Sequence, residues 1–130
     1  MSVGLYARSR SSELIKIGIP VDHIGFQIGE TAQVHTGGIL QATPHAVRGS
    51  NVPGVSRETF AVFMEPNWSE PMVCPADIDP TSAQSQSSAA NLPKGVPPLA
   101  LRWQASNGTE EGKPVQTFGE FSEATHKFYY

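Results

Sequence analysis

The chain has 130 residues, a length typical of a single domain. Its net charge of −3 lacks the basic excess with which proteins bind nucleic acid, so no nucleic-acid partner is expected. The 12 glycines and 11 prolines indicate a turn-rich chain and argue against a helical bundle.

Short strands are expected in the N-terminal part of the chain. Residues 3–8 and 13–19 predict two strands joined by a turn, because the second is rich in β-branched side chains and is followed by proline. Residues 24–28 alternate apolar and other side chains, which predicts a third strand. A short helical turn is expected over residues 30–35, before a Gly-Gly reversal.

Two further strands are expected to carry polar side chains of interest. Residues 39–47 predict a strand that includes His45. Residues 57–65 predict a strong strand on which Arg57 and Thr59 share one face. Several short strands joined by Gly and Pro turns favour a barrel or sandwich, so the expected fold class is mainly β.

The C-terminal half is expected to be different. Residues 80–98 hold one charged side chain and no aromatic one, which predicts a flexible loop without regular secondary structure. Further on, Thr117 and Glu120 fit a capping box, and apolar residues from Phe118 onward follow helical spacing. A short C-terminal helix that packs on the domain is therefore expected.

Arg57 and Thr59 have the chemistry of a carboxylate receptor. Side chains two residues apart on a strand lie roughly 6.5–7 Å apart on the same face. A guanidinium offers a planar fork of N–H donors that matches a carboxylate, and a neighbouring hydroxyl adds one more donor. If the adjacent strand brings His45 to the same cavity, a dicarboxylic acid held by Arg57 would reach a metal ion held by His45.

These motifs together resemble one family of oxygenases. The run Phe-Gln-Ile-Gly-Glu from residue 26, through the Gly-Gly turn to the Thr-Pro-His that ends at His45, is similar to a segment of plant-type 2-oxoglutarate- and Fe(II)-dependent oxygenases and isopenicillin N synthase relatives. In that family the corresponding strand carries the second iron histidine. Residues 56–63 resemble the family's Arg-x-Ser/Thr strand, and residues 4–7 resemble the strand that follows its His-x-Asp segment.

The resemblance implies a partial double-stranded β-helix, or jelly-roll, with a short C-terminal helix. It implies Fe(II) bound by His45 and 2-oxoglutarate bound by Arg57 and Thr59. Ala61 and Phe63 would line the same cavity. The implied activity couples decarboxylation of 2-oxoglutarate to oxidation of an unknown small organic substrate, with ascorbate as a supporting reductant.

The resemblance also implies a division of the chain into three parts and the absence of one family motif. Residues 1–78 would be the C-terminal half of a jelly-roll oxygenase domain, residues 79–114 a flexible loop rich in Ser, Pro and Gly, and residues 115–130 a helical tail packing on the domain. None of the 4 histidines has an acidic residue two positions later, so the family's His-x-Asp or His-x-Glu is missing. The chain is therefore expected to be a fragment that is inactive alone and needs an N-terminal half.

Two alternatives to this interpretation remain open. A non-catalytic jelly-roll or cupin-like module, binding a partner or a small acid, would need no iron triad. An enzyme completed by a second chain would obtain the other half of its site from that chain. Iron titration separates these alternatives, because the module binds no iron and the completed enzyme binds it only with its partner.

The expected location is the cytoplasm. No apolar run approaches the roughly 18 residues of a membrane span, so no membrane partner is expected. The N-terminus lacks the apolar region of a signal peptide. A single cysteine, Cys74, excludes an intrachain disulfide framework and fits a reducing compartment.

Overall fold

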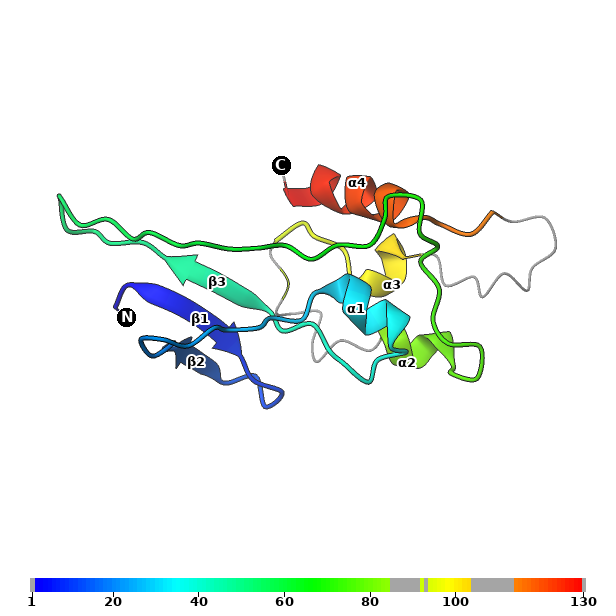
Figure 1. Cartoon of the computed structure of the whole chain (residues 1–130), viewed down its shortest axis with the longest axis horizontal. Helices are drawn as coiled ribbons and strands as arrows, with labels where there is room; N and C mark the ends of the chain where they lie inside the picture. Colours follow the sequence, from blue (N-terminus) through cyan, green and yellow to red (C-terminus); the bar gives the residue numbers. More distant parts are fainter. Residues whose placement is uncertain (1, 85–91, 93, 104–113, 130) are drawn as a thin grey trace.

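The structure, a computed structural model, describes residues 2–84, 92, 94–103 and 114–129. Within them the chain forms a small mixed α/β fold, with a three-stranded antiparallel sheet beside a group of helices (Figure 1). The elements in chain order are β1 (Gly4–Arg8), β2 (Leu14–Ile17), α1 (Glu30–His35), β3 (His45–Arg48), α2 (Pro80–Gln84), α3 (Leu99–Arg102) and α4 (Phe118–Tyr129). The three strands of the described part do not by themselves outline a jelly-roll barrel.

The sheet has β1 at its centre, in the order β2-β1-β3. The tight turn between β1 and β2 closes where the Ser9 N–H donates to the Glu13 carbonyl at 2.9 Å. Ala7 pairs with Ile15 on one side and with His45 on the other. The two N-terminal strands predicted from the sequence are therefore present, with the second ending earlier than expected. No side chain of β2 or β3 is buried, so no layer formed by the described residues covers these two strands.

The hydrophobic core lies among the helices rather than beneath the sheet. Trp103 is 1% exposed, and its indole N–H donates to the Met72 carbonyl at 2.8 Å, so the ring is both enclosed and hydrogen-bonded. The members of the core are Val34, Met72, Cys74, Ala83, Leu99, Trp103, Phe118 and Phe121. These apolar side chains come from all four helices and the segment before α2, so burying them holds the helical part together.

A buried ion pair joins α1, α3 and α4. The Arg102 side chain is fully buried, and its two terminal nitrogens donate to the Glu30 carboxylate at 2.6 and 2.7 Å. Its Nε donates to the Pro97 carbonyl at 2.8 Å, and Nη1 also donates to the Thr125 hydroxyl at 3.1 Å. The guanidinium lies over the Phe121 ring at 5.8 Å. One side chain thereby fixes three helices relative to one another.

The predicted capping box at the start of α4 is confirmed. The Glu120 carboxylate accepts the Thr117 backbone N–H at 2.8 Å, and the Thr117 hydroxyl accepts the Glu120 N–H at 3.3 Å. Reciprocal bonds of this kind satisfy N–H groups that the first turn of a helix leaves without partners. The predicted apolar face buries Phe118 and Phe121 in the core, whereas Phe128, which shares their helical spacing, is 47% exposed.

The prediction of a flexible loop is wrong at two helices. Both α2 and α3 fall within residues 79–114, and each contributes a buried residue to the core. Asp79 and Pro80 are the residue types that favour the cap and the first position of a helix, a local signal that the low hydrophobicity of the segment obscured. The Thr81 backbone N–H donates to Asp79, and the backbone and side-chain bonds from Thr81 hold the pKa of Asp79 below its ordinary value of 3.8. Residues 85–91, 93 and 104–113 of the predicted loop fall outside the described residues.

Three of the predicted strands are absent or shorter in the described chain. Residues 24–28 and 57–65 have no strand partner in the part of the chain that the structure describes, and the strand predicted over 39–47 is reduced to β3. Pro44 directly precedes β3 and has no N–H to contribute to a ladder. A strand also needs a paired neighbour for its N–H and C=O groups, and within the described chain none pairs with 57–65, where Phe60 is 94% exposed.

Candidate functional site

The side chains of Arg57 and Thr59 are in direct contact, closer than the strand spacing of roughly 6.5–7 Å expected from the sequence. Nη1 of Arg57 donates to Oγ1 of Thr59 at 2.6 Å. Both residues are exposed, on the stretch that returns from the turn at residues 52–55 (Figure 1). The expected enclosed cavity is not formed around them, since Ala61 is exposed and Phe63 is 83% exposed. The reason is that this stretch joins no sheet and is not covered by another element among the described residues.

His45 is the first residue of β3 and is exposed. Its Nδ1 lies 3.2 Å from the Thr43 carbonyl oxygen, which can accept only from a protonated nitrogen. The amide nitrogen of Gln27 lies 2.7 Å from Nδ1 and 3.0 Å from Nε2. The Gln27 N–H donates to whichever ring nitrogen lacks a proton: to Nδ1 at 2.7 Å, or to Nε2 at 3.0 Å when Nδ1 donates to Thr43. In the second tautomer Gln27 occupies the nitrogen that would otherwise be open to a ligand.

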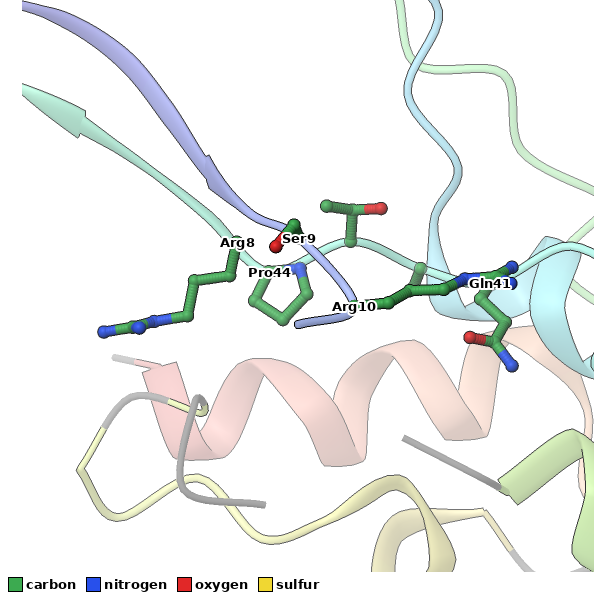
Figure 2. A pocket seen from close by; sticks show the side chains of 7 residues that line it. Arg8, Ser9, Arg10, Gln41 and Pro44 are labelled. Carbon is green, nitrogen blue, oxygen red and sulfur yellow. The ribbon is translucent and has the colours of Figure 1, made fainter. Parts of the chain in front are cut away.

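The structure does not bring His45 into contact with the carboxylate receptor. No hydrogen bond within the described chain joins His45 to Arg57 or Thr59. Before β3 lies a cavity of about 230 Å³, lined by Arg8, Ser9, Arg10, Gln41, Ala42, Thr43 and Pro44. Neither member of the receptor lines it. Figure 2 shows the two arginines of this cavity extending in different directions.

The described residues do not fit a complete iron centre. A facial triad needs two histidines and one carboxylate around one point. Within residues 2–84, 92, 94–103 and 114–129, no three His, Cys, Asp or Glu side chains are grouped closely enough to hold a metal ion. A triad that includes His45 would therefore need donors from outside the described residues.

Gln33 is an important positioning residue that the sequence pattern did not reveal. It is 1% exposed, and its amide donates to the Ala83 carbonyl at 2.8 Å while its carbonyl accepts the Ala42 N–H at 2.8 Å. These bonds tie α1 to α2 and to the stretch that leads into β3, and thus fix where His45 emerges. A glutamine on a short helix gives no local sign of this role, because both of its partners are distant in sequence.

Comparison with protein-family models, with curated proteins and with solved structures gives no match to this chain. The resemblance to oxygenases consequently depends on the motifs of the chain itself. Among the described helices, none is both long and apolar enough to cross a membrane.

Proposed function

We propose that this chain forms one half of an Fe(II)- and 2-oxoglutarate-dependent oxygenase site. In this proposal His45 is one iron ligand, and Arg57 with Thr59 holds the distal carboxylate of 2-oxoglutarate. The observation that supports it most is the 2.6 Å hydrogen bond between the exposed side chains of Arg57 and Thr59. The three-stranded sheet would then be part of a jelly-roll that another segment completes.

The contact between Arg57 and Thr59 leaves both groups able to bind a carboxylate. A guanidinium has five N–H donors, of which the bond to Thr59 uses one. The Thr59 hydroxyl accepts that bond and keeps its own hydrogen to donate. A carboxylate oxygen beside the pair would therefore receive an N–H and an O–H together. Hydrogen bonds to a charged group contribute about 1.5–3 kcal/mol each.

His45 has the hydrogen bonding of a potential metal ligand. Ligating histidines usually donate their second ring N–H to a carbonyl or carboxylate, which fixes the tautomer. The Thr43 carbonyl, 3.2 Å from Nδ1, is suited to this role and would direct Nε2 toward the metal once Gln27 moves aside. When bound, iron would supply oxygen activation coupled to decarboxylation of 2-oxoglutarate. The remaining ligands would come from a complementing segment that carries His-x-Asp.

The substrate class and location follow the same proposal. The oxidised substrate would be a small organic molecule, and ascorbate would keep the iron reduced. A cytoplasmic location is consistent with the one cysteine, Cys74, which is buried as a thiol.

A binding experiment tests the carboxylate receptor without iron. In an NMR titration with 2-oxoglutarate, amide shifts should concentrate around residues 57–59, with acetate as the monocarboxylate reference. Arg57→Gln should weaken binding about 10- to 150-fold, since it removes a charge-assisted bond. The matched control is Arg48→Gln, which removes another exposed arginine and should leave binding unchanged. Equal losses in the two variants would show that general charge attraction, and not this receptor, binds the ligand.

A turnover experiment tests the half-site. The chain is joined to the sequence encoded directly upstream of it, and succinate formation is measured with Fe(II), ascorbate and oxygen. His45→Ala should abolish turnover, whereas His23→Ala, at an exposed turn histidine, should not. Carboxylate binding that persists while iron binding and turnover are absent in the longer protein would favour the non-catalytic module instead.

A further inference from the structure

Residues 57–65 form an exposed apolar stretch. Their backbone N–H and C=O groups have no hydrogen-bond partner within the part of the chain that the structure describes. The large apolar side chains of the stretch are Phe60 at 94% exposure, Val62 at 72%, Phe63 at 83% and Met64 at 83%. Apolar side chains alternate to both faces, which is typical of a strand within a sheet rather than of a surface loop.

The unpaired backbone indicates what kind of partner can cover this stretch. A row of free N–H and C=O groups is a template for another strand. A lipid surface would bury the apolar side chains and leave these groups without partners, which is costly in hydrocarbon. An extended polypeptide satisfies both requirements. The occupant is therefore a β-strand.

The charges at the two ends of the stretch identify which strand fits. Glu65 lies eight positions after Arg57, which is an even step, so the two side chains lie on the same face of an extended chain. We infer that residues 57–65 pair antiparallel with the same residues of a second copy, about a two-fold axis through Ala61. In this register Arg57 of each copy lies opposite Glu65 of the other, which gives two opposite-charge pairs.

The other cross-strand pairs of this register are also favourable. Phe60 of one copy lies opposite Val62 of the other, and Thr59 lies opposite Phe63, so aromatic and β-branched side chains meet on both faces. A parallel pairing in register would bring Arg57 beside Arg57. An antiparallel slip by two residues would remove both charge pairs. Charge complementarity therefore selects one register.

This inference goes beyond the proposed function, although both involve Arg57. Exchanging the charges at positions 57 and 65 distinguishes the strand pairing from the proposed ligand binding. The double variant Arg57→Glu/Glu65→Arg restores opposite charges across the two-fold axis, so it should dimerise. The same variant removes the guanidinium at position 57, so it should not bind 2-oxoglutarate there. The dimerisation measurement therefore tests only the strand pairing, and the ligand-binding measurement tests only the proposed carboxylate receptor.

The main experiment measures the mass of the full chain in solution by sedimentation over about a hundredfold range of concentration. The wild-type chain should reach twice its 14.0 kDa mass. Arg57→Glu and Glu65→Arg should each weaken dimerisation about tenfold, because like charges would face each other twice. The double variant should recover to within about threefold of wild type. A wild-type chain that stays monomeric, forms larger aggregates, or dimerises only with a strand from another protein overturns the inference.

A cross-linking experiment reads the register directly. In a Cys74→Ser background, Ala61→Cys places two thiols opposite each other across the axis, and mild oxidation should link the copies. Val62→Cys is the matched control, because its two thiols would lie a diagonal step apart, roughly 8 Å between Cα atoms. Efficient linking through position 62 in preference to position 61 would contradict the proposed register.

Discussion

Replacing Arg102 with alanine should destabilise the chain strongly. The Arg102 side chain is fully buried and makes a two-pronged contact with Glu30, whose side chain is 20% exposed. Truncation leaves that carboxylate without its guanidinium in a largely buried place, which typically costs 3–5 kcal/mol. Because Glu30 keeps some contact with water, we expect the lower part of this range, about 3 kcal/mol. The lost contact over Phe121 adds about 0.5–1 kcal/mol.

This loss is large relative to the roughly 5–15 kcal/mol that stabilises an ordinary domain. It should lower the melting temperature by roughly 10–15 °C. Urea unfolding followed by circular dichroism and by the fluorescence of buried Trp103 measures it. Arg48→Ala, at an exposed strand position, should change stability by less than about 0.5 kcal/mol. The double variant Arg102→Met/Glu30→Leu should recover much of the loss, since it leaves no unpaired charge. A loss below about 1 kcal/mol for Arg102→Ala would refute the reasoning.

Three further variants test local features of the fold. Gly38→Ala should cost at least about 2 kcal/mol in urea unfolding, because φ is +86° and a Cβ would collide with the Ser82 carbonyl; Gly49→Ala, which meets open space, should be close to neutral. Glu120→Ala removes half of the capping box and should cost about 1 kcal/mol, whereas Glu120→Gln should retain most of the stability. The lowered pKa of Asp79 means that its contribution is present above pH 3.8 and is lost as the pH falls through the lower folded value, so Asp79→Asn should flatten stability against pH there. If the free energy of unfolding of the wild type and of Asp79→Asn falls equally as the pH is lowered, that assignment is contradicted.

Short-range interactions explain which features the sequence predicted correctly. The capping box joins residues three apart, so the local pattern was sufficient to predict it. The turn between β1 and β2 is equally local. Asp79 and Pro80 also carried a local signal for the start of a helix. The low hydrophobicity of the following residues was given more weight, and the segment was predicted to be a loop.

The candidate site was predictable only in part. The chemistry of Arg57 with Thr59 follows from residue type and spacing, but their exposure does not. The contact of Gln27 with His45 spans 18 residues and depends on how the chain returns to the sheet edge. Whether residues 57–65 become a strand depends on a partner that pairs with them, because ladder hydrogen bonds are made between segments and not within one.

By itself, the sequence determined the elements that short-range bonds can close: the N-terminal hairpin and the capped C-terminal helix. Only the tertiary structure decided which distant groups meet. Arg102 binds Glu30 across 72 positions, and Gln33 binds Ala83 across 50. No spacing rule encodes these pairs, because their free energy depends on burial, and burial is set by how the helices pack.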